Sequence, residues 1–172
     1  MLFFWIAAPI VMIFGFVVFW GAPYVPSKKK EIEQAFTELY PLSDRDVLVD
    51  IGSGDGIVLR AAAKKGARAV GYELNPLLVG IARMVSRGDR LVSVKLANFW
   101  RVPLPDDTTV VYSFGESRDI QRMAEKVACE ADRLQRQLTF ISYAFEVPGQ
   151  KPQKTSGAYF LYVYKPLQTK KA

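Results

Sequence analysis

The stretch VLVDIGSGDG, residues 47–56, decides the fold class of this chain. A short β-branched run ends in Asp50, and the next six residues include Gly52, Gly54 and Gly56. A strand that leads into a glycine-rich turn and then a helix is typical of the first βα unit of an open parallel sheet. Ligands bind such sheets beyond the carboxyl ends of the strands, so the turn is predicted to form part of a binding site.

The rest of the chain alternates between predicted strands and predicted helices. Further strands are predicted at 68–74, 92–97, 108–114, 138–145 and 159–164, and helices at 28–40, 57–65, 76–86 and 118–137. Such alternation is typical of βαβ units, which form a sheet covered by helices on both faces. We therefore expect an α/β fold with a mostly parallel sheet of six to seven strands.

The N-terminal segment has a different composition. Residues 1–20 read MLFFWIAAPIVMIFGFVVFW, and no charged side chain occurs before Lys28. A helix of about 20 apolar residues rises roughly 30 Å, the thickness of the hydrocarbon core of a bilayer. A cleaved signal peptide would need a basic start and a shorter apolar run, and a buried helix would need more surrounding protein. We predict a transmembrane anchor at residues 1–22.

Three lysines predict the orientation of this anchor. Lys28, Lys29 and Lys30 follow it, and basic residues beside a span favour the cytoplasmic side of a membrane. We expect a single-pass membrane protein whose partner is the bilayer and whose folded domain is cytoplasmic. The chain then divides into the anchor (1–22), a connecting segment with a helix (23–45) and an α/β domain (46–172).

The composition excludes several classes of site. The 172 residues include no histidine and one cysteine, Cys129. This excludes Ser-His-Asp chemistry and a disulfide framework, and it leaves no metal site to expect. A net charge of +6 suits nucleic acid and anionic lipid equally. No basic and aromatic residues interleave along one stripe, so no nucleic-acid partner is expected.

The glycine-rich turn suits S-adenosylmethionine better than a dinucleotide. A dinucleotide site would have a third glycine where this chain has Ile57, and Asp50 and Asp55 would repel a pyrophosphate. The same carboxylates suit the cationic amino-acid end of S-adenosylmethionine, while Gly52 and Gly54 let the backbone approach a ligand. The predicted cofactor is S-adenosylmethionine, bound in this turn by Asp50, Gly52, Ser53, Gly54 and Asp55.

Two more strand ends carry residues that suit the rest of this cofactor. Glu73, at the end of the second predicted strand, can accept hydrogen bonds from both ribose hydroxyls, and Leu74 follows it. After the third strand, the Asn98 amide can bond the adenine edge and Phe99 can cover the ring face. Core packing is the alternative role for Phe99.

The end of the fourth strand is where the methyl group should meet its acceptor. Phe114 and Glu116 stand there, and Trp100 follows the third strand. Aromatic walls favour the neutral form of an acceptor amine, and a carboxylate can help remove its proton. The predicted catalytic residues are therefore Glu116, Trp100 and Phe114.

Taken together, these motifs resemble the small membrane-anchored seven-β-strand protein lysine methyltransferases. Eukaryotic members of that family modify the adenine nucleotide translocase and the membrane-ring subunit of ATP synthase. The resemblance covers nearly the whole chain and rests on residues 24–27, 50–56, 72–76, 98–100, 114–115 and 159–164.

This resemblance has implications for the fold, the cofactor and the acceptor. It implies a Rossmann-like class I methyltransferase sheet preceded by one transmembrane helix, with S-adenosylmethionine as cofactor. The implied acceptor is a lysine of a membrane protein, and Tyr24 and Ser27 are implied to fold over the cofactor. The chain departs from many relatives at Asn98, where they carry an acid, and at 116–118, where they carry apolar residues and proline.

Three other functions stay open. A methyltransferase acting on RNA or lipid would use the same cofactor turn. A non-catalytic membrane module would bind S-adenosylmethionine without transferring a methyl group. A nicotinamide oxidoreductase is disfavoured by the missing third glycine.

Overall fold

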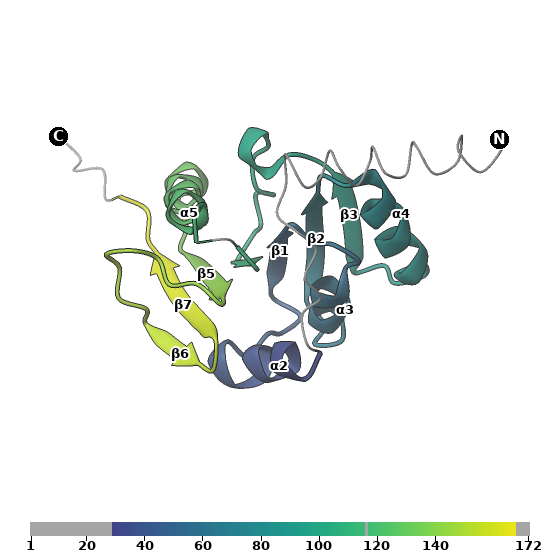
Figure 1. Ribbon diagram of the computed structural model, residues 1–172, viewed down its shortest axis with the longest axis horizontal. Helices are drawn as coiled ribbons and strands as arrows, with labels where there is room; N and C mark the ends of the chain where they lie inside the picture. Colours follow the sequence, from purple (N-terminus) through teal and green to yellow (C-terminus); the bar gives the residue numbers. More distant parts are fainter. Residues whose placement is uncertain (1–28, 116, 168–172) are drawn as a thin grey trace, which may run out of the picture.

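The computed structural model describes residues 29–115 and 117–167. These residues form a seven-stranded sheet with helices on both faces (Figure 1). The strands are β1 (Val47–Ile51), β2 (Arg68–Glu73), β3 (Val92–Leu96), β4 (Val110–Ser113), β5 (Leu138–Tyr143), β6 (Lys154–Ser156) and β7 (Tyr159–Tyr164). The helices are α2 (Lys29–Gln34), the π-helix η1 (Ala35–Leu39), α3 (Ile57–Ala63), α4 (Pro76–Val85), the 3₁₀-helix η2 (Phe99–Arg101) and α5 (Ile120–Leu134).

The strand order places a topological switch point between β1 and β4. The order is β3-β2-β1-β4-β5-β7-β6, and the first five strands of the chain run parallel. The chain builds outward from β1 to β3 and then returns to β4 on the other side of β1. β7 pairs antiparallel with β5, and β6 with β7. The predicted α/β fold with a mostly parallel sheet of six to seven strands is confirmed.

Each face of the sheet carries its own apolar core. On one face α2, η1, α3 and α4 cover residues such as Leu48, Tyr112 and Ile141. On the other, α5 covers Val111 and Phe140. These sets alternate along β4 and β5, because successive side chains of a strand point to opposite faces. Figure 1 shows α4 beside β3 at one end of the sheet and α5 beside β5 and β7 toward the other.

Several element boundaries differ from those predicted. The helix predicted at 28–40 is α2 followed by the π-helix η1, and the helix predicted at 118–137 is the shorter α5. Helix α5 ends where Gln135 adopts a left-handed backbone conformation, with φ +50°. Strand β6 was not predicted, because its sequence KTS is polar and too short to show an alternating pattern.

The predicted membrane anchor lies outside the described residues, as does the segment with Tyr24 and Ser27. Among residues 29–115 and 117–167, no helix is long and apolar enough to cross a bilayer.

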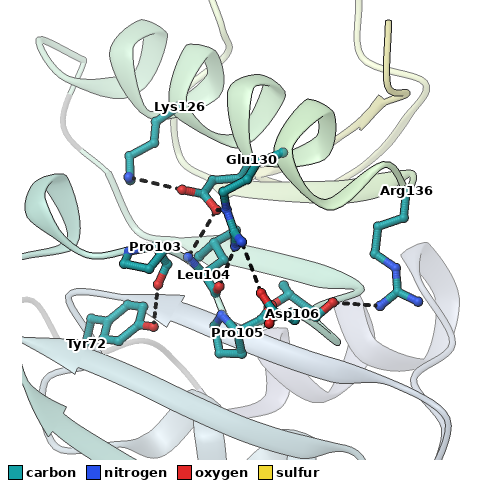
Figure 2. A network of polar contacts seen from close by, with 10 residues as sticks. Tyr72, Pro103, Leu104, Pro105, Asp106, Lys126, Glu130 and Arg136 are labelled. Carbon is teal, nitrogen blue, oxygen red and sulfur yellow. Dashed lines mark hydrogen bonds and ion pairs between the residues drawn. The ribbon is translucent and has the colours of Figure 1, made fainter. Parts of the chain in front are cut away.

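A polar network holds the loop between η2 and β4 against α5 (Figure 2). The buried Glu130 carboxylate accepts hydrogen bonds from the Leu104 amide (3.1 Å) and from Arg133 Nε (2.8 Å). The Arg133 guanidinium in turn donates to the Leu104 carbonyl (2.7 Å) and to Asp106 (3.0 Å). Tyr72 of β2 donates its hydroxyl to the Pro103 carbonyl (3.0 Å). These hydrogen bonds hold the loop between η2 and β4 against both α5 and β2.

Replacing Glu130 should loosen this loop. We expect Glu130→Ala to lower the free energy of unfolding by about 2 kcal/mol, because a buried amide and a guanidinium lose a charged acceptor. The measurement is chemical denaturation. Glu125→Ala on the exposed face of α5 serves as the control and should change stability by less than about 0.5 kcal/mol. Equal effects of the two variants would contradict the role assigned to Glu130.

Candidate functional site

The turn after β1 is built on backbone conformations that favour glycine. Gly52 has φ +72° and Gly54 φ +54°, both in the left-handed region. The amides of Gly52 and Ser53 both donate to the Tyr72 carbonyl of β2, at 2.9 and 3.2 Å. These two hydrogen bonds hold the turn after β1 against the C-terminal end of β2.

The Glu73 carboxylate stabilises this turn by accepting two hydrogen bonds from backbone amides. One oxygen of its carboxylate accepts from the Gly54 amide (2.9 Å) and the other from the Asn75 amide (2.7 Å). The side chain is 9% exposed. A carboxylate has about four acceptor sites, so these two bonds leave capacity for the ribose hydroxyls predicted to bind there.

The turn also packs closely on β2 at Gly71. A β-carbon on Gly71 would lie 2.7 Å from Ser53 Cβ and 2.7 Å from Leu59 Cδ1, distances that force one of the groups to move. The buried Ser53 hydroxyl has no hydrogen-bond partner within the described chain. An unpaired buried hydroxyl in such a turn is a donor or acceptor available to a ligand.

Asp50 is a second group suited to a ligand, specifically a cationic one. Its side chain is 2% exposed near the end of β1. Burial, and then the negative charges of Glu73 and Asp55, raise the pKa of the Asp50 carboxyl well above its ordinary value. A cation bound beside it would reverse that shift.

The Asp55 side chain is engaged within its own helix start. Asp55 Oδ1 accepts from the Ile57 amide (3.1 Å), and Oδ2 lies 3.4 Å from Arg60 Nη2. Asp55 thus contributes negative charge near Asp50 while helping to begin α3.

The other residues predicted to bind the cofactor lie in different environments. Leu74 is 48% exposed directly after β2. Asn98 caps η2 and accepts the Trp100 amide on Oδ1 (3.0 Å), which leaves its amide hydrogens as donors. Phe99 is buried in the core under α5, with Lys126 Nζ 5.2 Å from its ring centroid. Core packing accounts for Phe99, and its contact with a cofactor stays a prediction.

The predicted catalytic residues do not come together as one described group. Trp100 packs on the α5 side of the sheet, with the Arg122 guanidinium 4.3 Å from its ring centroid. Phe114 lies against Tyr143, which packs with the core on the other side (centroids 4.8 Å apart). Glu116 lies outside the described residues, as do Tyr24 and Ser27.

A group that was not predicted adjoins Phe114. Tyr143 ends β5 and pairs in register with Tyr159 of β7, and their ring centroids are 4.7 Å apart. The Tyr143 hydroxyl donates to Glu31 Oε2 of α2 at 2.8 Å. Tyr143 is the last residue of β5, but the strand predicted from the sequence extended to residue 145, so this strand-end position was not apparent. Nothing local could have indicated Glu31.

We treat these groups as the polar half and the aromatic half of one candidate site, because β1, β4 and β5 end side by side in the sheet. Asp50, Glu73 and Ser53 supply two carboxylates and a hydroxyl around the glycine turn, which suits a cationic amino acid joined to a sugar. Among the described residues, no group of acidic, histidine or cysteine side chains could hold a metal ion.

Comparison with known proteins identifies a family model that matches this region. The model of the ANTKMT methyltransferase domain matches residues 50–154. That range begins at Asp50 and includes β2, β3, β4 and β5 in full.

Two curated relatives are named as protein lysine methyltransferases. The lysine N-methyltransferase of the ATP synthase c-subunit from Mus musculus is 36% identical over 138 residues, which cover 78% of this chain and 53% of that protein. The chain thus spans about half the length of this relative. The protein-lysine N-methyltransferase of Saccharolobus islandicus is 28% identical over 137 residues, covering 77% of this chain and 82% of the relative.

A solved structure shares the fold closely. The RNA methyltransferase from Salinibacter ruber, in complex with S-adenosyl-L-homocysteine, superposes with a TM-score of 0.73 at 26% identity. The comparison covers 86% of this chain and 98% of that one.

The close packing at Gly71 should not tolerate a methyl group. We expect Gly71→Ala to lower the free energy of unfolding by about 1–3 kcal/mol, because the turn must move off β2. Gly80→Ala is the matched control, since a β-carbon there meets no atom within 4 Å and the residue is helical. That control should stabilise the protein by about 0.5–1 kcal/mol. Thermal or chemical denaturation measures both, and a stabilising Gly71→Ala would refute the packing argument.

The raised pKa of Asp50 predicts a pH-dependent stability. A carboxyl whose pKa is higher in the folded protein contributes stability below its unfolded pKa, and that contribution is lost as the pH rises through the folded pKa. Asp50→Asn carries no such charge. We therefore expect the variant to be more stable than wild type at pH 7, with the difference closing toward about pH 4. Denaturation at the two pH values measures this, and a variant less stable at pH 7 would contradict it.

Proposed function

The chain belongs to the family of the ANTKMT methyltransferase domain, and from this membership we propose that it is an S-adenosylmethionine-dependent protein-lysine N-methyltransferase. The observation that carries the proposal is the match of the family model over residues 50–154. This range includes the glycine turn and Glu73, the residue whose carboxylate stabilises the turn. Membership also confirms the family resemblance predicted from the motifs. The acceptor that we propose is a lysine of a membrane protein, as the name of the mouse relative suggests.

The polar half of the site fits S-adenosylmethionine. This cofactor supplies a methyl group on a sulfonium, which leaves as a neutral thioether. Asp50 would pair with its cationic amino group, Glu73 would accept from its ribose hydroxyls, and Asn98 would donate to its adenine. Two observations support this assignment. Burial and neighbouring negative charges raise the pKa of the Asp50 carboxyl, which a cation would relieve, and the buried Ser53 hydroxyl has no partner in the described chain.

The aromatic half suits an amine acceptor. A lysine amine is protonated in water and must become neutral before it attacks a methyl carbon. Apolar surroundings such as the Phe114 and Tyr143 rings favour the neutral form. The protein's own residues therefore orient the two reactants, exclude water and accept one proton.

Membrane anchoring is part of the proposal. The absence of charge before Lys28 and the run of apolar residues at 1–22 support one transmembrane helix, with the domain on the cytoplasmic side. An anchored enzyme meets membrane proteins at high local concentration, which agrees with an acceptor in the bilayer.

One comparison favours a different acceptor class. The structure with a TM-score of 0.73 is an RNA methyltransferase, and it is matched along nearly its whole length. The identity to the mouse lysine methyltransferase is higher, 36% against 26%, so we favour lysine. RNA is the alternative that the experiment must separate.

The test is transfer of labelled methyl groups. The full-length protein in detergent is incubated with methyl-labelled S-adenosylmethionine and either native membranes or the purified c-subunit of ATP synthase. We expect protease-sensitive label in a polypeptide, at lysine. Glu73→Ala should abolish it and weaken S-adenosylhomocysteine binding by at least about 100-fold, because two bonds to a charged group are lost.

One variant serves as the control for this test, and three other outcomes would each identify a different function. Glu146→Ala, an exposed carboxylate outside the site, should label as wild type does. Nuclease-sensitive label would establish the RNA alternative, and label extracted with lipid would establish a lipid methyltransferase. Binding of S-adenosylhomocysteine without any transfer would identify a non-catalytic module.

A further inference from the structure

Three aromatic rings and one carboxylate meet beside the glycine turn. Ser113 pairs with Ile51 across β4 and β1, so Phe114 follows β4 where the turn begins at Gly52. Ser142 of β5 pairs with Ser113, and Tyr143 therefore lies next to Phe114. The register thus places these aromatic residues in a row that begins at the cofactor turn.

The row continues to the antiparallel strand. Tyr159 pairs with Tyr143, and the rings are tilted by 49° with centroids 4.7 Å apart. The Phe114 and Tyr143 rings meet edge to face at 4.8 Å. Phe114 and Tyr143 are partly exposed, whereas Tyr159 is buried, so the first two can present surface to a ligand.

Glu31 adds a carboxylate to this row from a distant part of the chain. It lies in the first turn of α2, is partly buried, and accepts the Tyr143 hydroxyl at 2.8 Å. That hydrogen bond, together with burial and the charge of Glu31, raises the pKa of Tyr143, so the tyrosine stays a donor.

A carboxylate that is hydrogen-bonded to one ring of an aromatic row has chemistry suited to an amine. Ring faces attract ammonium groups, and a desolvated carboxylate binds them more strongly than one in water. The alternative is that Glu31 and Tyr143 only fasten α2 to the sheet. Ile32, Ala35 and Phe36 already bury that segment against the core, so α2 and η1 have apolar contacts that serve this purpose.

We propose that Glu31, Tyr143 and Phe114 form the acceptor half of the active site, with Glu31 binding the lysine ammonium and taking its proton. Tyr143 is a positioning residue that orients the carboxylate, and Phe114 is the wall nearest the cofactor turn. This assignment rests on the proposed methyltransferase function and names the residues that receive its acceptor.

The chemistry balances with one proton transferred. The ammonium gives a proton to the Glu31 carboxylate, and apolar surroundings favour the neutral amine and acid over the ion pair. The nitrogen lone pair then forms the bond to the methyl carbon as the carbon–sulfur bond breaks, and that electron pair stays on sulfur. The product is a methylated ammonium and a neutral thioether, and Glu31 releases its proton to water.

The kinetic test compares matched variants with the purified c-subunit of ATP synthase as acceptor. Glu31→Gln should lower kcat/KM for methyl transfer by at least about 100-fold, and Tyr143→Phe by about tenfold. Both should bind S-adenosylhomocysteine within about twofold of wild type, since neither residue is placed in the cofactor half. Glu33→Gln on the exposed side of α2 and Tyr164→Phe at the far end of β7 are the controls and should retain activity.

A binding test does not depend on turnover. The full-length protein, labelled with ¹³C in its tyrosine rings and saturated with S-adenosylhomocysteine, is titrated with n-butylammonium. Tyr143 and Tyr159 resonances, assigned with the tyrosine variants, should shift in wild type and in Glu33→Gln. They should not shift in Glu31→Gln. If Glu31 had only a structural role, these resonances would shift in Glu31→Gln as they do in wild type.

The outcomes separate this assignment from the proposed function. Wild-type transfer to lysine that persists in Glu31→Gln would overturn the acceptor site and leave the methyltransferase intact. Loss of S-adenosylhomocysteine binding in parallel with activity would also overturn it, because Glu31 would then act on the fold or the cofactor. Absence of transfer by wild type to any polypeptide would refute the lysine methyltransferase itself.

Discussion

The Glu73 carboxylate is the contact on which the candidate site depends. It joins the turn after β1, through the Gly54 amide, to the start of α4, through the Asn75 amide. Glycines at positive φ cost more conformational entropy on folding than other residues, and these charge-assisted bonds offset part of that cost. A ligand that reaches Glu73 therefore meets a turn already ordered, which lowers the entropy lost on binding.

The local sequence was sufficient to predict the strand, glycine turn and helix at 47–65. The run at 47–56 determines its own conformation, since the glycines, the preceding strand and the following helix are neighbours in the chain. Glu73 could be placed because parallel strands end at the same edge of a sheet. What the sequence did not show is that Glu73 stabilises the turn, because its partner, the Gly54 amide, lies 19 residues away.

The acceptor half could be predicted only in part, for a geometric reason. Alternation along β4 and β5 places Phe114 and Tyr143 on one face, but Trp100 follows a loop beyond β3, where alternation no longer assigns a face. The sequence therefore grouped Trp100 with Phe114, although they pack on opposite sides of the sheet. Glu31 and Tyr143 are 112 residues apart, and only the packing of α2 brings them together.

The position of Glu31 in the chain would link the proposed acceptor half of the site to the membrane. Under the proposed anchor, six residues separate the end of the span at 22 from the start of α2 at Lys29. An extended chain of that length reaches at most about 25 Å. Glu31 lies in the first turn of α2, so such an anchor would confine its carboxylate to a layer close to the bilayer surface. A lysine near the headgroups of a membrane protein lies within that layer, whereas a lysine far from the membrane does not.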